Sequence, residues 1–160
     1  MNWDAIGAIG QMLGSITVLV TLIYLAAQIR QNTTSVRAAT FQNIVGMATT
    51  FAHDLAKDPE LRRVMNLGLS AQPMSESDER VFHLLMISFL RRYENMHYQS
   101  RMGLLNDGQW QGLRESLLRI LRRPGFRSWW QDNAATMNAD FREFVDDHLV
   151  LPNAEGAGSR

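Results

Sequence analysis

"AIGAIGQMLGSITVLVTLIYLAA", residues 5–27, is the stretch that decides the fold, because it runs for 23 positions without a charged side chain. An α-helix of this length crosses the roughly 30 Å hydrocarbon core of a bilayer at about 1.5 Å per residue. Trp3 and Tyr24 lie near its two ends, where amphipathic rings favour the headgroup level. A buried core helix is the alternative, but no other segment is apolar enough to surround this one. Residues 1–30 are therefore predicted to form a single transmembrane anchor.

The charges that flank the span predict its orientation. Arg30 and Arg37 follow it, "MNWD" before it holds no lysine or arginine, and no acidic residue follows the span until Asp54. Positively charged flanks stay on the cytoplasmic side, so the C-terminal domain is expected in the cytoplasm. The absence of basic residues before the span also disfavours a cleaved signal peptide.

Small and polar residues form a seam along one face of the span, at steps of three and four positions. The members of this seam are Gly7, Gly10, Gly14, Thr17, Thr21, Tyr24 and Gln28. Small residues let helix backbones approach, and hydroxyl or amide groups can hydrogen-bond across a helix pair in lipid, so the seam predicts a helix–helix interface. Two alternatives are that the glycines are incidental, and that Thr17, Thr21 and Gln28 line a pore.

Composition narrows the class of protein. In 160 residues, 16 basic and 16 acidic side chains cancel, which argues against nucleic acid as a partner. The chain has no cysteine, so disulfides, thiolate nucleophiles and zinc–thiolate sites are excluded. Its length fits one domain with a real core.

The chain after the anchor is predicted to form water-exposed helices. Its apolar residues recur at helical spacing, and no alternating strand pattern appears. A second helical stretch contains Phe41 and Leu55. It is either a continuation of the anchor helix or a new helix that begins with Thr34 or Ser35 as its N-cap. "DPE" at 58–60 predicts a short helix to about Leu69.

The later helices are bounded by caps and breakers. Ser75 with Asp78 resembles a capping box that opens a helix over 76–105. Its predicted buried face comprises Phe82, Leu85, Met86, Phe89, Tyr93, Met96 and Ser100. A further helix is expected to end at "PG", residues 124–125, and shorter ones cover 126–132 and 139–149. The fold class is thus all-α, an N-terminal transmembrane helix followed by an antiparallel helical bundle over 31–150, with a disordered tail at 151–160.

Three segments, "WDAIGAIGQMLGSITVLVTLIYLAAQIRQNT", "RYENMHYQSRMGLLNDGQWQG" and "RPGFRSWW", carry a resemblance. Together they resemble a widespread family of uncharacterised bacterial membrane proteins, from Asn2 to about Leu149. The resemblance implies a single-pass anchor, a cytoplasmic helical domain and a location in the bacterial inner membrane. It implies no activity, catalytic residue or cofactor.

One copy of a sequence motif used by di-metal proteins, Glu-x-x-His, is present. Di-metal carboxylate bundles use Glu-x-x-His on two helices, and Glu94 with His97 forms one such step. A second Glu-x-x-His motif is missing. The residue three positions before His148 is Val145, and the one three positions before His53 is Thr50, so neither is a glutamate. The interpretation we favour is a satisfied polar layer in which Glu94 and His97 pair with each other or with neighbouring arginines, and neither a metal nor another cofactor is expected.

A basic and aromatic cluster precedes the C-terminal helices. Four arginines lie beside Trp129 and Trp130, a mixture that can contact lipid headgroups or another anion. These arginines are Arg119, Arg122, Arg123 and Arg127. The alternative is that Arg122 and Arg123 simply stabilise a helix C-terminus.

No catalytic fingerprint appears in the chain. The predicted function is a non-enzymatic, membrane-anchored helical module that self-associates or serves as an accessory subunit of a membrane complex. The alternatives are a homo-oligomeric channel or membrane-active effector, and a bundle enzyme that binds a metal or cofactor through Glu94 and His97. The expected partners are the lipid bilayer and either further copies of the chain or a larger complex.

Overall fold

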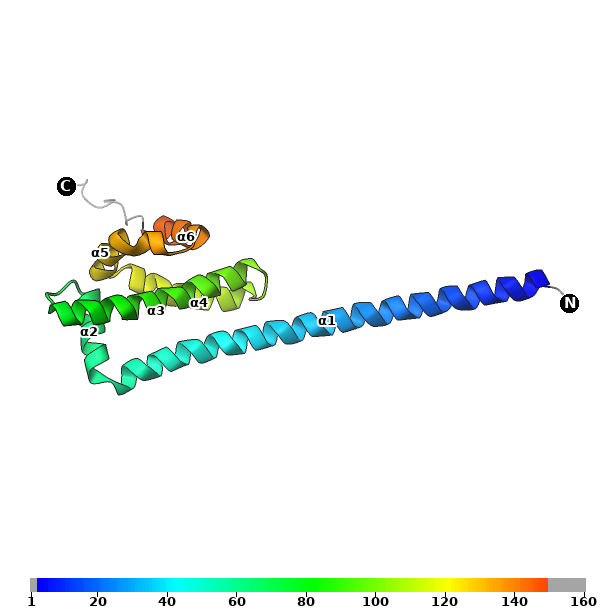
Figure 1. Cartoon of the computed structure of the whole chain (residues 1–160), viewed down its shortest axis with the longest axis horizontal. Coiled ribbons are helices and arrows are strands. Elements are labelled where there is room, and N and C mark those ends of the chain that lie inside the picture. Colours follow the sequence, from blue (N-terminus) through cyan, green and yellow to red (C-terminus); the bar gives the residue numbers. More distant parts are fainter. Residues whose placement is uncertain (1–2, 150–160) are drawn as a thin grey trace, which may run out of the picture. The chain divides into compact units, whose positions relative to one another are not determined.

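The computed structural model describes residues 3–149, and all regular structure in that range is helical (Figure 1). The elements are α1 (Trp3–Lys57), α2 (Pro59–Leu69), α3 (Glu76–Arg101), α4 (Asp107–Leu121), α5 (Pro124–Asn133), the 3₁₀ helix η1 (Ala134–Thr136) and α6 (Ala139–Leu149). The prediction of an all-α protein is confirmed for these residues. The predicted disordered tail, 151–160, lies outside them. The chain divides into an N-terminal unit, Met1–Thr40, and a C-terminal unit, Phe41–Arg160, which we describe separately.

The sequence left open whether the anchor helix continues after the span or a new helix begins at Thr34 or Ser35. In the structure, α1 continues without a break to Lys57. The hydroxyls of Thr33, Thr34 and Ser35 donate to the carbonyl oxygens four residues earlier, at 2.9, 3.1 and 3.1 Å. A hydroxyl bonded in this way lies along its own helix instead of capping a new one. The polar stretch therefore does not interrupt the helix.

In the N-terminal unit, every side chain from Ile9 to Ala39 is exposed. Large aliphatic groups are included, with Ile23 63% and Leu19 59% exposed. Among the described residues, α1 is the one helix that is long and apolar enough to cross a membrane, and no part of its most apolar window is buried within the protein. The alternative of a buried core helix is therefore wrong for this segment in the single chain.

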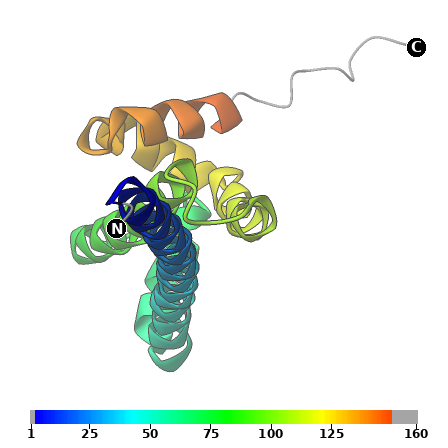
Figure 2. The same cartoon turned by 90° about the vertical axis from the view of Figure 1, so that its right-hand side faces the viewer.

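The C-terminal unit has its main hydrophobic core among α2, α3, α4, α5 and α6. The contacts of α2 with α3 and α5, and of α3 and α4 with α6, close this core. In both views of the chain, α5 and α6 lie above α3 (Figures 1 and 2). The fully buried side chains of this main hydrophobic core include Val64, Met86, Leu90, Leu117, Leu121, Phe126, Phe141 and Val145.

A second cluster of buried side chains joins the end of α1 to α3. Ile44, Met96 and Leu105 form it, with Phe41 and Trp110 packed against its edge. Further along α1, Phe51 contacts Phe89 of α3, at 5.8 Å between ring centroids. The apolar spacing recognised in the sequence after residue 40 therefore corresponds to a face that packs on the rest of the C-terminal unit.

Two glycines allow α2 to approach α5 and α3 closely. A Cβ placed on Gly125 would overlap the carbonyl oxygen of Gly68, and one placed on Gly68 would overlap the ring of Phe82. Both glycines are buried. The absence of a Cβ is therefore a steric requirement of the α2–α5 crossing at Gly125 and of the α2–α3 contact at Gly68.

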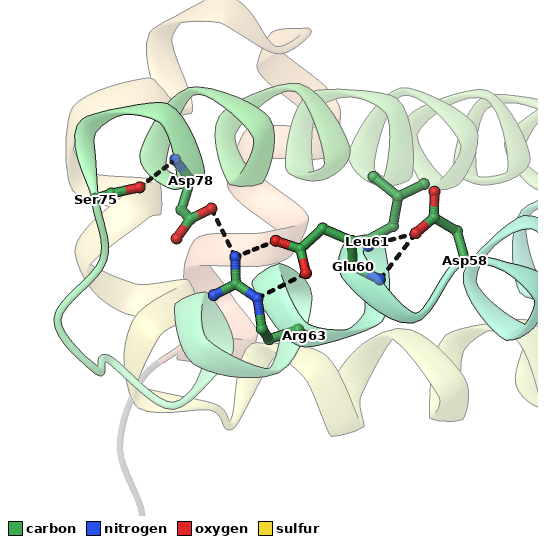
Figure 3. Close-up of polar contacts among 6 residues, drawn as sticks. All are labelled: Asp58, Glu60, Leu61, Arg63, Ser75 and Asp78. Atoms are coloured by element: carbon green, nitrogen blue, oxygen red, sulfur yellow. Dashed lines mark hydrogen bonds and ion pairs between the residues drawn. The ribbon is translucent and has the colours of Figure 1, made fainter.

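Capping residues set the starts of α2 and α3 (Figure 3). The carboxylate of Asp58 accepts from the backbone N–H groups of Glu60 and Leu61, at 2.8 and 3.1 Å. The hydroxyl of Ser75 accepts from the N–H of Asp78 at 3.1 Å. These bonds satisfy backbone donors that a helix start leaves free, and they confirm both predicted starts.

The side chain of Asp78 does not complete a capping box with Ser75, because it turns to another helix. Its carboxylate accepts from Arg63 of α2 at 2.8 Å, and the same guanidinium also binds Glu60 (Figure 3). The hydrogen bond from Arg63 lowers the pKa of the Asp78 and Glu60 carboxyls below their ordinary values. Arg63 thus links α2 to the first turn of α3.

The predicted end of α3 and part of its buried face are wrong. The helix ends at Arg101 instead of 105, and Gly103 follows with φ of +69°, a conformation that glycine adopts readily. Leu90 and His97 are buried on this helix although neither was named in the predicted face. Leu85, Tyr93 and Ser100 are only half-buried. A reciprocal capping box of Asn106 with Gln109 then starts α4.

Candidate functional site

The seam glycines of the N-terminal unit have open space beside them. No atom of the described residues, apart from chain neighbours and the helix's own backbone, lies within 4 Å of a Cβ built on Gly7, Gly10 or Gly14. At 100° per residue, positions 7, 10 and 14 fall on one side of the helix. The seam therefore presents bare backbone that a second helix can approach.

The two threonines of the seam have used their donors but not their acceptors. The hydroxyl of Thr17 donates to the carbonyl of Leu13 at 2.9 Å, and that of Thr21 donates to the carbonyl of Thr17 at 2.8 Å. Each oxygen can still accept a hydrogen bond from another molecule. Tyr24 and Gln28 continue the same face and are exposed. The face can thus receive both close packing and polar contacts.

The structure places Glu94 and His97 on α3 but does not pair them by a hydrogen bond. One oxygen of Glu94 accepts from Arg91 at 2.7 Å, and the other accepts from the backbone N–H of Asn138. Glu94 therefore pairs with an arginine, which was one of the expected arrangements. Within residues 3–149, no group of three or more His, Cys, Asp or Glu side chains is placed to hold a metal ion.

His97 belongs to an aromatic cluster. Its ring lies 4.9 Å from Phe144, 5.6 Å from Trp110 and 5.8 Å from Phe141, measured between centroids. Burial lowers the pKa of His97, nearby Arg101 lowers it further, and Asp140 opposes this effect. The imidazole is therefore a mainly neutral group at pH 7.

A cavity of about 460 Å³ opens beside this cluster, between the second half of α3 and the start of α6. It is lined by Arg91, Glu94, Asn95, His97, Tyr98, Arg101, Met102, Asn138, Asp140 and Phe141. Of these, Glu94 and His97 were singled out from the sequence, with Arg91 and Arg101 among the arginines expected to pair with them. Helical spacing within 91–102 indicates that several of these side chains share a face, but no sequence pattern indicates that residues 138–141 lie against them.

The four arginines that were predicted to contact an anion differ in their exposure and in their hydrogen-bond partners. Arg119 and Arg122 are exposed, and Arg122 is the C-cap of α4, which agrees with the helix-terminus alternative. Arg123 donates to the hydroxyl of Ser70 at 2.8 Å, while Arg127 is half-buried. None of the four lines the cavity between α3 and α6.

Arg92 is a structural residue that the sequence did not reveal. Its guanidinium carbon lies 3.8 Å from the centroid of the Phe51 ring, and its Nη1 donates to the carbonyl of Met47 at 3.3 Å. Burial lowers the pKa of Arg92. This side chain fastens α3 to the end of α1.

The described residues thus define an all-helical protein with one helix that is long and apolar enough to cross a membrane. No protein-family model, no curated protein and no solved structure matches the chain.

Proposed function

We propose that this chain is a non-enzymatic, membrane-tethered helical module that self-associates through the seam of α1 or docks by it onto a larger membrane complex. The first part of α1 spans the bacterial inner membrane once, and the C-terminal unit lies in the cytoplasm as an antiparallel bundle. The observation that carries this proposal is the exposure of every side chain from Ile9 to Ala39. The apolar part of this surface, which ends at Ala27, has a large free-energy cost in water, and a bilayer removes that cost.

The seam supports assembly in addition to anchoring. Aliphatic faces gain little by leaving lipid, because lipid tails are as apolar as leucine. A face with open space beside Gly10 and Gly14 gains close backbone packing when a second helix lies on it. The free acceptors of Thr17 and Thr21 add polar contacts that lipid cannot offer.

We do not propose metal chemistry at Glu94 and His97. Both oxygens of Glu94 already accept hydrogen bonds, from Arg91 and from the N–H of Asn138. A metal would have to displace these donors and would leave the N–H of Asn138 without a partner.

The double variant Gly10→Leu with Gly14→Leu tests the seam. Leucine side chains at these positions hold two backbones apart, so we expect the mass of the protein in detergent to fall toward that of one chain. The matched control is Ser15→Leu with Ala26→Leu, which adds comparable bulk to a different face and leaves the mass unchanged. Light scattering coupled to size exclusion measures both.

Circular dichroism and tryptophan fluorescence must show that the C-terminal unit stays folded in all variants. An unchanged mass in the glycine variant, or an equal loss in both variants, contradicts self-association through the seam. If the wild-type chain is already a monomer in detergent, crosslinking in native membranes distinguishes docking to a different protein, because the crosslinked partner then differs in mass from the chain itself.

A further inference from the structure

The cavity between α3 and α6 has the features of a ligand site. Its volume of about 460 Å³ lies within the range of ordinary small-molecule sites. It combines aromatic and aliphatic side chains with several polar groups, which is typical of sites that orient a small molecule. The proposed role of the seam makes no use of it.

His97 has polar atoms that the protein leaves without a partner. The residue is 8% exposed, and no hydrogen bond within residues 3–149 involves its ring. Aromatic neighbours cover its faces, and the ring lines the cavity. The ring nitrogens are not among the buried polar atoms that lack a partner, so they are accessible from the cavity, where a ligand can exchange a hydrogen bond with them.

The free donors of the cavity outnumber its free acceptors. Both oxygens of Glu94 are engaged by Arg91 and the N–H of Asn138, which leaves Asp140 as the remaining carboxylate. The nearest approach of Arg101 to Asp140 is 4.0 Å, which is longer than a hydrogen bond. The guanidinium of Arg101 is therefore available to an incoming acceptor.

The cavity also has an apolar wall. Tyr98 and Met102 are 57% and 60% exposed, and Phe141 closes the inner side. Since Arg91 and Arg101 are balanced by Glu94 and Asp140, a bare inorganic ion gains little from net charge here. A ligand that also covers the apolar wall gains more.

We propose that this cavity binds a small oxyanion attached to an apolar group, a phosphate monoester or carboxylate, whose oxygens bind Arg101 and the His97 ring. Its organic part lies against Tyr98 and Met102. The anion accepts from the guanidinium donors of Arg101 that Asp140, 4.0 Å away, leaves free.

Calorimetric titration of the intact chain in detergent with phenyl phosphate tests this inference. We expect saturable binding that inorganic phosphate reproduces only more weakly. Arg101→Gln should weaken phenyl phosphate binding by about tenfold or more, as expected for loss of a charge-assisted hydrogen bond. Arg80→Gln is the matched control, because Arg80 is on the same helix, equally exposed, and pairs with Glu76 away from the cavity.

Histidine ring NMR of the same samples supplies a second measurement. Phenyl phosphate should shift the ring signals of His97 and leave those of His83 unchanged. Equal weakening by Arg101→Gln and Arg80→Gln, absence of saturable binding, or shifts of His83 without His97 would overturn the proposal.

The oxyanion could come from a lipid headgroup or from a soluble molecule, and nanodiscs separate the two sources. The phenyl phosphate titration is repeated in phosphatidylcholine nanodiscs with and without phosphatidic acid. Competition by phosphatidic acid supports the cavity with a lipid as its source. Undiminished phenyl phosphate binding supports it with a soluble ligand.

Discussion

At the scale of single residues, the close contact between Gly68 and Gly125 leaves no room for a side chain at position 125. The main chain of α2 lies where a Cβ of Gly125 would be. Backbone cannot move aside as a flexible side chain can, so even a methyl group at this position is too large.

Gly125→Ala is therefore expected to destabilise the C-terminal unit by about 1–3 kcal/mol or more, as overpacking does. Gly112 is the matched control, because it lies within α4 and a Cβ placed on it would meet no atom beyond its chain neighbours and the local helix backbone. Gly112→Ala should stabilise the unit by about 0.5–1 kcal/mol through its better helix propensity. Denaturant unfolding followed by tryptophan fluorescence measures both, and equal effects of the two variants would show that the close approach is absent.

His97 predicts a dependence of stability on pH. Its pKa is lowered in the folded chain by burial and by Arg101, with Asp140 opposing. The unfolded chain, with an ordinary histidine pKa of about 6.5, takes up the proton first as the pH falls. This residue therefore contributes a loss of stability that begins near that pH, increases on acidification, and is absent at higher pH.

His97→Phe should remove this component of the pH dependence and keep the ring packing with Trp110 and Phe144. We expect the free energy of unfolding of the variant to decrease less than that of the wild type when the pH is lowered through the histidine range. Parallel pH profiles for the two proteins would contradict the assignment to His97.

At the scale of elements, local signals explain which helices could be predicted. Asp58 followed by Pro59 indicated the start of α2, and its predicted end at Leu69 is also correct. The start of α3 after Ser75 and the range 139–149 for α6 are likewise correct. Capping side chains act within a few residues, so the sequence displays them directly.

The helix start at Asp58 can be tested by substitution. Asp58→Ala removes the acceptor for the N–H groups of Glu60 and Leu61 and should cost about 0.5–2 kcal/mol of stability. Asp58→Asn retains a capping oxygen and should cost clearly less. Chemical unfolding of the three proteins decides this, and equal losses for Ala and Asn would show that the carboxylate charge, not the cap, provides the stabilisation.

The features that the sequence did not reveal depend on contacts between distant segments. The burial of His97 requires Trp110 and Phe144 from two other helices, and the cavity requires Asn138 and Asp140 beside α3. No local pattern records such a contact. The unbroken course of α1 was also undecided, because its hydroxyl groups suit both a cap and an internal hydrogen bond.

At the scale of the whole molecule, the two units differ in how their apolar side chains are covered. The N-terminal unit carries apolar surface that the protein itself leaves uncovered. The C-terminal unit has its own hydrophobic core and its own cavity. Under the two proposals above, the N-terminal unit holds a ligand-binding unit at a membrane and brings copies or partners together there.

Fractionation of cells that express the intact chain tests most directly whether α1 lies partly in hydrocarbon. After lysis, membranes are washed with alkaline carbonate and separated by ultracentrifugation, and the chain is then extracted with detergent. We expect the chain to stay in the washed membrane pellet and to be released only by detergent, whereas Leu19→Arg with Ile23→Arg reduces this retention because each charge opposes insertion by about 2.5–3.5 kcal/mol. Recovery of the unmodified chain in the detergent-free supernatant would contradict a membrane-spanning α1.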